Sequence, residues 1–343
     1  MIHTTTNTSM ISNCSLLPWQ PQDYQQITHA LLSGSQAIIM HGIQGIGKRS
    51  LAQEIIRYLL CTNKTAEGYA CGGCRSCILH INNNHPDIFT IADEEGNKIK
   101  VDVIKKLLHE SLSTTPSISN TKVVYIPDFQ LITKQGANGL LKTLEEPSQS
   151  LVFIIVVDEI SSVLPTILSR CIKINLKKPN TLQVEDYLSK TVETEPINHF
   201  WHKYFYNAPL VSPLFSDEQL QIITNCLLTP SINNILKTTE EFDGKKISFA
   251  AFIDFMYKWI SELAQCFIIS QDQSQKSINT PAKLNKSIFP QYSMENLLNK
   301  LSIDKLLDLQ DDLHIFKEFL QHPLNYKLQI ENILFKYQQC FCK

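Results

Sequence analysis

The sequence lacks the features of a membrane-inserted, a secreted or a strongly basic protein. Its longest apolar run, 151–157, has seven residues, far fewer than the roughly 20 that a membrane-spanning helix needs. The first 15 residues contain no basic segment followed by an apolar core, so they do not resemble a secretory signal. A net charge of −2 gives no general excess of positive charge for binding nucleic acid. These absences predict a cytoplasmic protein without a membrane segment.

One glycine-containing loop is the most informative stretch of the chain. Gly42, Gly45 and Gly47 precede Lys48, and the apolar run Ala37–Met40 leads into them. This spacing fits the phosphate loop G-x-x-x-x-G-K, in which glycine lets backbone N–H groups converge on a phosphate. The N-terminus of the helix that follows adds a favourable dipole. The sequence predicts a phosphate loop, and the simpler alternative is a glycine-rich turn before a helix.

Positions that bind Mg²⁺ and activate water in a hydrolysing enzyme of this type are altered. Such enzymes carry Ser or Thr after the loop lysine, whereas Arg49 follows Lys48 here. The next strongly apolar strand ends in Pro127-Asp128, although the metal-binding carboxylate is expected where the proline stands. We interpret Asp128 as a solvated loop carboxylate. The residues therefore predict weak or absent ATP binding and no intrinsic hydrolysis.

Four of the ten cysteines lie close together in the sequence. Their spacing is C-x9-C-x2-C-x2-C, at Cys61, Cys71, Cys74 and Cys77. In a reducing compartment such a cluster favours metal binding over disulfides. Four thiolates complete a tetrahedron around Zn²⁺ and leave no position for water, which predicts a structural zinc site. An iron–sulfur cluster is the chemical competitor, but the bacterial ferredoxin run ends in a further Cys-Pro that is absent here. Four unligated cysteines are the remaining alternative.

The pattern of apolar residues divides the chain into an α/β part and a helical part. Predicted strands and helices alternate from residue 37 to 176, which indicates a parallel sheet covered on both faces. Beyond residue 179 only helical patterns follow, the longest at 217–228, 249–269, 295–320 and 324–341. The sequence predicts a P-loop type α/β domain over 1–178 with a zinc insert at 61–77, a small helical domain over 179–212 and an all-α domain over 213–343.

Several strings of residues, taken in order, resemble the clamp loaders of bacterial DNA polymerase III. They are the loop, the four cysteines, His85-Pro86-Asp87, L-L-K-T-L-E-E-P at 140–147 and I-L-S-R-C at 167–171. The resemblance covers roughly the first half of the chain, and the helical remainder is similar only in length and class. It implies an AAA+ module, a helical lid and a helical collar that joins five subunits, including motor and delta subunits, in a ring.

The resemblance also implies a function in DNA replication. Such a ring opens a sliding clamp and places it on primed DNA. Its ATP sites lie between subunits, and the arginine of S-R-C reaches the neighbour's nucleotide, which identifies Arg170 as an arginine finger in trans. A guanidinium suits that role because it remains charged and spreads over phosphate oxygens. The alternative for Arg170 is an ordinary surface salt bridge.

Two kinds of clamp-loader subunit share these strings. The motor subunits, gamma and tau, keep Thr or Ser after the loop lysine, Asp-Glu after the relevant strand and a polar residue at the end of the next strand. This chain has Arg49, Pro127-Asp128 and Val157 at those positions. The resemblance therefore implies a subunit that does not hydrolyse ATP in its own site. An active motor that uses Lys48, and a zinc-bearing adaptor unrelated to replication, are the alternatives.

Overall fold

The computed structural model describes residues 16–93, 97–191, 204–205, 208–211, 214–244, 248–273, 289, 295–318 and 325–341. The chain divides into two compact units. The first comprises Met1–Glu195 with Phe205–Val211, and the second comprises Pro196–Tyr204 with Ser212–Lys343. Part of the predicted helical domain over 179–212, including 192–203, lies outside the described residues, so its separation from the first domain remains a prediction.

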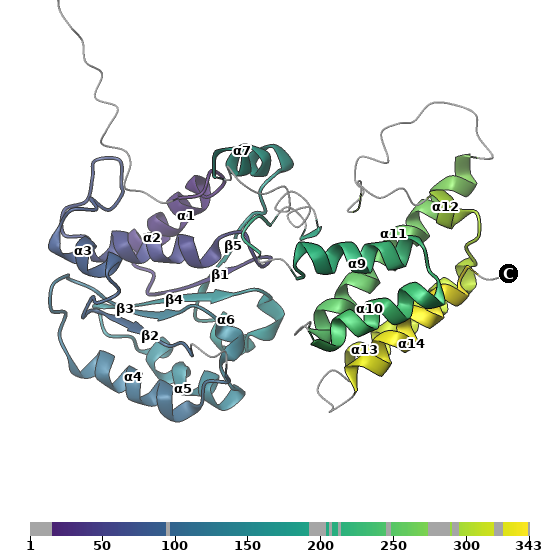
Figure 1. Ribbon diagram of the computed structural model, residues 1–343. Helices are drawn as coiled ribbons and strands as arrows, with labels where there is room; N and C mark the ends of the chain where they lie inside the picture. The colour runs from purple at the N-terminus through teal and green to yellow at the C-terminus, as the bar shows by residue number, and fades with distance from the viewer. Residues whose placement is uncertain are drawn as a thin grey trace, which may run out of the picture. The chain divides into compact units, whose positions relative to one another are not determined.

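The first unit is built on a five-stranded parallel sheet with the strand order β2-β3-β4-β1-β5 (Figure 1). All four strand pairs are parallel, which confirms the predicted sheet. The central strand β4 is buried along its whole length, as expected when helices cover both faces. The strands are β1 (Ala37–His41), β2 (Ile88–Thr90), β3 (Lys122–Ile126), β4 (Leu151–Val157) and β5 (Ile172–Asn175).

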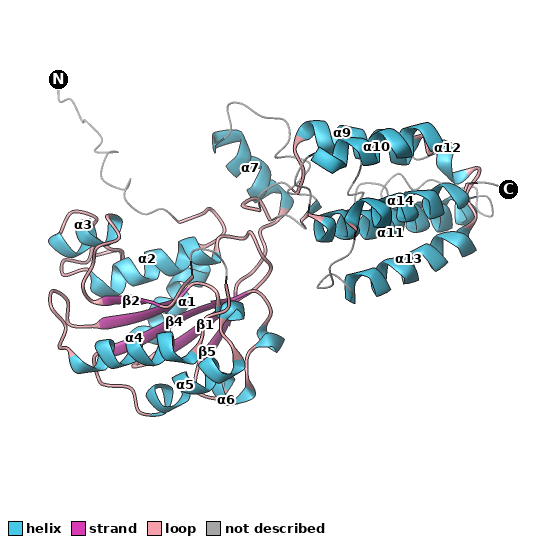
Figure 2. Cartoon of the chain, turned by 60° about the horizontal axis from the view of Figure 1, so that its bottom comes forward, coloured by secondary structure: helices cyan, strands magenta, loops and turns pink. Residues whose placement is uncertain are grey.

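Helices pack against both faces of this sheet (Figure 2). Alternate residues of β1 show why: Ile38 and Met40 face one core together with Ile55 of α2, whereas Ile39 faces the other core together with Leu140 of α5. The helices and short 3-10 turns of this unit are α1 (Pro21–Leu32), α2 (Lys48–Leu60), α3 (Arg75–Ile81), α4 (Val101–Ser113), η1 (Phe129–Leu131), α5 (Lys134–Glu145), η2 (Ile160–Ser162), α6 (Pro165–Leu168) and α7 (Thr181–Thr191).

The second unit is helical throughout its described residues, as predicted. Its centre is the buried Trp259, whose indole N–H donates to the hydroxyl of Tyr337 at 3.0 Å. The Tyr337 hydroxyl in turn donates to the carbonyl of Leu227, so this pair connects three helices. The helices are α9 (Asp217–Leu228), α10 (Ile232–Gly244), α11 (Phe249–Gln273), α12 (Glu295–Leu298), α13 (Ile303–Glu318) and α14 (Tyr326–Gln339).

Two features of the helical unit differ from the sequence prediction. The helix expected over 295–320 is interrupted, because α12 ends at Leu298 and α13 begins at Ile303. Between them the backbone N–H of Ser302 donates to the carbonyl of Cys340, beyond the end of α14. Helix α10 was missed because its buried face includes Thr238 and Thr239, whose hydroxyls bond to carbonyls of their own helix. In the part of the chain that the structure describes, no helix is long and apolar enough to cross a membrane.

Candidate nucleotide loop and cysteine cluster

The glycine-rich loop connects the end of β1 to the start of α2, where a phosphate loop is expected. Gly45 and Gly47 have φ angles of 82° and 85°, in the left-handed region that glycine adopts readily. Space also requires glycine, since a Cβ on Gly45 would lie 2.1 Å from Cγ2 of Val211. A Cβ on Gly47 would meet Leu17 at 2.3 Å. The glycines therefore fix the course of this loop.

Three carbonyls of the loop are held by segments that lie far from it in the sequence. The indole N–H of Trp19 donates to the carbonyl of Ile46 at 3.0 Å, and the amide of Gln20 donates to that of Gly47 at 2.8 Å. The backbone N–H of Leu210 donates to the carbonyl of Gly45 at 3.0 Å. Because these carbonyls are bound from outside, the shape of the loop is set before any ligand arrives.

Lys48 is buried beneath the loop, and its ammonium group has three acceptors. Its Nζ donates to the carbonyls of Gly42 and Ile43, both at 2.7 Å. It also forms an ion pair with Asp158 at 2.6 Å. An ammonium group has three protons, so these contacts account for all of them. Asp158 follows β4 directly, and its acidic character after a buried strand was the only sequence signal for this role.

Arg49 lies on the exposed side of the loop and contacts the end of β3. Its Nε donates to the carbonyl of Pro127 at 3.1 Å, and its guanidinium pairs with the carboxylate of Asp128 at 3.3 Å. Asp128 also caps η1 by accepting from the backbone N–H of Gln130. Asp128 is therefore not the solvated loop carboxylate that the sequence suggested. Val157, at the third altered position, is buried and has no polar side-chain atom.

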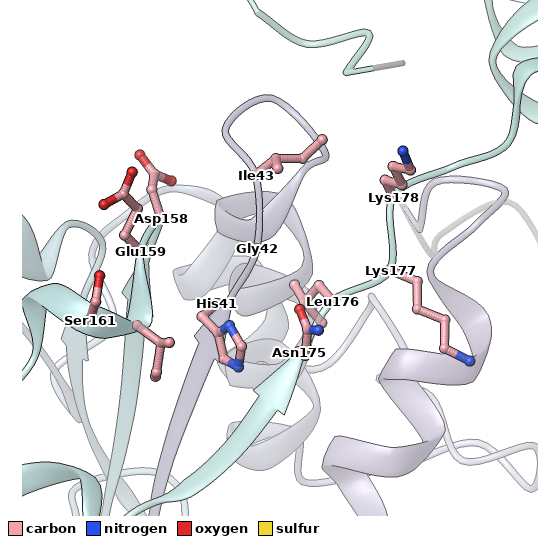
Figure 3. Close-up of a pocket in the computed structure, with 11 residues that line it drawn as sticks. His41, Gly42, Ile43, Asp158, Glu159, Ser161, Asn175, Leu176, Lys177 and Lys178 are labelled. Atoms are coloured by element: carbon pink, nitrogen blue, oxygen red, sulfur yellow. The ribbon is translucent and has the colours of Figure 1, made fainter. Parts of the chain in front are cut away.

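A cavity of about 570 Å³ opens beside the loop, at the carboxyl ends of β4, β1 and β5 (Figure 3). In open α/β sheets this edge is where ligands bind. His41 lies in its wall, and burial together with the nearby charge of Lys48 lowers the pKa of its imidazole, which therefore remains neutral at pH 7. The other lining residues are Gly42, Ile43, Asp158, Glu159, Ile160, Ser161, Asn175, Leu176, Lys177 and Lys178.

Arg170 is the second residue after α6, and its described contacts are to residues of α5 and α6 and to the adjacent Ser169. Its guanidinium pairs with Glu145 at 2.5 Å and donates to the carbonyl of Thr166 at 2.6 Å. The side chain is 32% exposed and that of Glu145 is 49% exposed. The ordinary salt bridge considered as an alternative is thus present within the chain. The strings L-L-K-T-L-E-E-P and S-R-C meet through this pair.

The structure brings the four predicted cysteines together. Cys61 follows α2, Cys71 lies in the next loop, Cys74 caps α3 and Cys77 lies in its first turn. All four Sγ atoms lie within 4.8 Å of one another, and Cys61 lies 3.6 Å from Cys71 and 3.9 Å from Cys74. A tetrahedral Zn²⁺ with Zn–S bonds of about 2.3 Å separates its sulfurs by about 3.8 Å. This cluster therefore fits a tetrahedral metal ion.

Hydrogen bonds to sulfur also suit thiolate ligands in this cluster. Backbone N–H groups of Cys71, Cys74 and Cys77 each donate to the sulfur of a preceding cysteine, at 3.3–3.4 Å. Burial alone would raise the pKa of Cys74, but hydrogen bonds from Cys77 and Thr62 outweigh it and lower the value to about 5. A thiolate, the form that binds metal, is thus favoured at Cys74, whereas burial raises the pKa of the Cys61 and Cys77 thiols.

The His85-Pro86-Asp87 string anchors this cysteine-bearing insert to the sheet. The backbone N–H of Asp87 donates to Nδ1 of His85, so the proton lies on Nε2, which is 2.8 Å from the Ser76 hydroxyl. That hydroxyl donates to the carbonyl of Leu60 at the end of α2. The carboxylate of Asp87 accepts from three consecutive backbone N–H groups, those of residues 117–119. The string therefore has a structural role that the sequence did not show.

The fold and the loop define a class of protein. Proteins of this class have a parallel α/β unit in which a glycine-rich loop follows the first strand along the chain, here β1. A helical unit follows the α/β unit in the sequence. The structure brings the loop glycines and Lys48 together at one turn and the cysteines together at another. It places Arg170 in a separate group of contacts.

Residues 19–180 match the protein-family model described as "DNA polymerase III, delta subunit". DNA polymerase III subunit delta' of Pseudomonas aeruginosa is 34% identical over 182 residues, which are 53% of this chain and 55% of the relative. The corresponding subunit of Buchnera aphidicola subsp. Baizongia pistaciae is 27% identical over 72% of this chain and 76% of the relative.

A subunit of another type is also similar. DNA polymerase III subunit gamma of the same Buchnera is 27% identical over 53% of this chain and 51% of the relative. The chain thus spans about half the length of the first relatives that it matches. Delta' and gamma subunits are thus each similar to about half of this chain.

Proposed function

We propose that this chain is a delta-prime-type subunit of a DNA polymerase III clamp loader, and that it acts in DNA replication without hydrolysing ATP itself. The observation that carries the proposal is the ion pair of Arg49 with Asp128. In a motor subunit a hydroxyl follows the loop lysine and helps to hold Mg²⁺ together with an acid after the corresponding strand. Here Arg49 occupies the position of the hydroxyl. Its guanidinium neutralises Asp128, which is the acid nearest to the position of the metal-binding carboxylate.

The third altered position supports the same conclusion. Val157 ends β4 with a buried hydrocarbon side chain, where a motor subunit has a polar residue that senses the nucleotide. Mg²⁺ needs oxygen ligands in near-octahedral geometry, and at the two positions that hold it in a motor subunit the side chains of Arg49 and Pro127 offer none. The loop made by Gly42, Gly45, Gly47 and Lys48 is then a vestigial phosphate loop with weak or absent nucleotide binding.

Arg170 is proposed to act in a neighbouring subunit's site. Its guanidinium is partly exposed, and its partner Glu145 is still more exposed, so the ion pair exchanges with solvent at little cost. An approaching γ-phosphate, which carries more negative charge than one carboxylate, would compete for the same guanidinium. In this proposal Glu145 holds the arginine in position until the ring is assembled.

The four-cysteine cluster is proposed to hold a structural Zn²⁺. Cys61, Cys71, Cys74 and Cys77 supply four thiolates, and zinc would tie the end of α2 to α3. With all four positions filled by sulfur, the ion would have no site for water or substrate.

The remaining parts of the proposal come from the family. Residues 1–178 would form the AAA+ module, 179–212 the lid and 213–343 the collar. The collar would assemble with motor and delta subunits in a pentameric ring, and through that ring the chain would meet the sliding clamp and primed DNA in the bacterial cytoplasm.

The proposal is tested by two measurements on the purified chain. Steady-state ATP hydrolysis is compared between the wild type and Lys48→Ala, and co-assembly with motor and delta subunits is followed by size-exclusion chromatography. We expect no turnover above that of the variant and a stable complex with the motor and delta subunits. Failure to enter any such complex would refute the clamp-loader function.

The alternative is an active motor subunit similar to gamma and tau. The observation in its favour is that Lys48 and the three loop glycines are retained in the geometry of a formed loop. ATP turnover that disappears in Lys48→Ala would establish this alternative and would show that another acid completes the site.

A further inference from the structure

The charge of the loop lysine is already neutralised within the chain. The Lys48 side chain is only 5% exposed, and besides two loop carbonyls its ammonium contacts the carboxylate of Asp158 at 2.6 Å. A buried ammonium requires an anionic or strongly polar partner, and a carboxylate oxygen supplies the same charge-assisted contact that a phosphate oxygen would. Asp158 thus makes the contact that a bound phosphate needs.

We propose that Asp158 is a built-in anionic occupant of the glycine-rich loop, and that it sets the loop's affinity for polyphosphates by competing for Lys48. The inference rests on the proposed descent of the loop from a phosphate loop. A nucleotide that takes the anionic contact with Lys48 displaces Asp158, so one charge-assisted hydrogen bond is exchanged for another. The net gain is small, whereas in a loop with a free lysine it would be large.

The position of Asp158 allows this exchange. It follows the last residue of β4, next to β1 in the sheet, at the edge where the loop begins (Figure 3). Its side chain is 33% exposed and lines the cavity of about 570 Å³, so the displaced carboxylate has an open, hydrated space to enter. The adjacent Glu159 lines the same cavity and is exposed, which makes it a matched control of equal charge.

The second cation of the loop is neutralised in the same way. Arg49 pairs with Asp128 at 3.3 Å. The two cations and two carboxylates sum to zero, so the loop offers no net positive charge to a polyphosphate beyond its backbone N–H groups. The two ion pairs differ in burial, because Lys48 is buried whereas Arg49 is exposed. Water therefore screens the pair of Lys48 with Asp158 less than the pair of Arg49 with Asp128.

The test is calorimetric titration of the full-length purified chain with ATP and, separately, with inorganic pyrophosphate, in buffer without chelator. We expect Asp158→Asn, which keeps the size and removes the charge, to lower the Kd for both ligands at least tenfold, equivalent to about 1.4 kcal/mol. Glu159→Gln should change the Kd less than twofold. The double variant Asp158→Asn with Lys48→Ala should lose the gain.

If wild-type binding is too weak to detect, the highest ligand concentration used sets the lower limit of its Kd. An unchanged affinity in folded Asp158→Asn overturns the inference, as does an equal gain in Glu159→Gln, which would show a general effect of charge. Circular dichroism verifies folding, and Asp158→Ser replaces the first variant if that one does not fold.

This experiment is independent of the clamp-loader proposal. A chain that assembles with clamp-loader subunits but shows no gain in Asp158→Asn refutes only the role of Asp158. A chain that shows the gain but does not assemble refutes only the clamp-loader function.

Discussion

Replacing Arg170 by alanine should separate a role in a neighbouring subunit from a role within the chain. Within the chain the arginine pairs with Glu145, and the two side chains are 32% and 49% exposed. Exposed ion pairs contribute about 0.2–1 kcal/mol, and the hydrogen bond to the carbonyl of Thr166 adds a similar amount. We therefore expect Arg170→Ala to lower the stability of the isolated chain by about 1–2 kcal/mol and to leave assembly intact.

The effect on catalysis should be far larger if Arg170 acts in trans. An arginine finger accelerates hydrolysis by about 10³–10⁵, which corresponds to roughly 4–7 kcal/mol of activation free energy. The assay is clamp- and DNA-stimulated ATP hydrolysis by a reconstituted complex in which only the motor subunit next to this chain keeps its own loop lysine. In that complex Arg170→Ala should reduce the rate of hydrolysis at least about 10²-fold. This limit lies below the acceleration of about 10³–10⁵ that an arginine finger gives.

Two variants serve as controls for this prediction. Glu145→Gln breaks the ion pair but keeps the guanidinium, so hydrolysis should be maintained. Arg170→Lys keeps the charge but loses the planar, forked donors, so it should recover only a small part of the rate. Unchanged hydrolysis in an intact complex that contains Arg170→Ala would refute the finger and leave the arginine as a surface salt bridge.

The other predictions concern metal and stability. Metal analysis should find about one zinc per chain, lost in Cys74→Ser and kept in Cys226→Ser, and the detection of iron or of no metal would contradict the site. For Asp87, burial would raise the pKa of the carboxyl, but hydrogen bonds from backbone N–H groups outweigh burial and lower it. Its contribution to stability is therefore complete above the unfolded pKa of about 3.9 and is lost as the pH falls through the folded value. Asp87→Asn should lower the free energy of unfolding by about 2–4 kcal/mol at pH 7. When that free energy is measured by urea denaturation at a series of pH values, its fall toward acid pH should be flatter in the variant. An unaltered pH dependence would count against this account. Tyr337→Phe should lower the free energy of unfolding by about 1–3 kcal/mol, measured by urea denaturation, because its hydroxyl joins the Trp259 indole to a carbonyl of α9. A change below 0.5 kcal/mol would argue against that link.

Local patterns predicted the α/β unit well, because its strands are short, apolar and separated by strong stop signals. The run Leu151–Val157 became the central strand β4, and the apolar strand expected before Pro127 became β3. The helical unit was harder to predict, because several of its contacts are made by polar residues. Thr238 and Thr239 are buried in α10, and a turn whose N–H bonds to a distant carbonyl separates α12 from α13.

The sequence by itself determined which residues can take part in each site. The spacing of Gly42, Gly45, Gly47 and Lys48 identified the loop, because glycine readily adopts the backbone angles that such a turn needs. The spacing of the four cysteines identified the cysteine cluster, because potential ligands that lie close in sequence can meet with little chain rearrangement.

Only the tertiary structure decided how those residues are paired. Arg49 meets Asp128 from 79 residues away, Arg170 meets Glu145 from 25 residues away, and Lys48 meets Asp158 across two neighbouring strands. A parallel sheet places the carboxyl ends of all its strands at one edge, which makes neighbours of Arg49 and Asp128 and of Lys48 and Asp158. Arg170 and Glu145 meet because α6 packs against α5. Their separation along the chain gives no sign of this. The glycine-rich loop is visible in the sequence, but the carboxylate that holds its lysine is visible only in the fold.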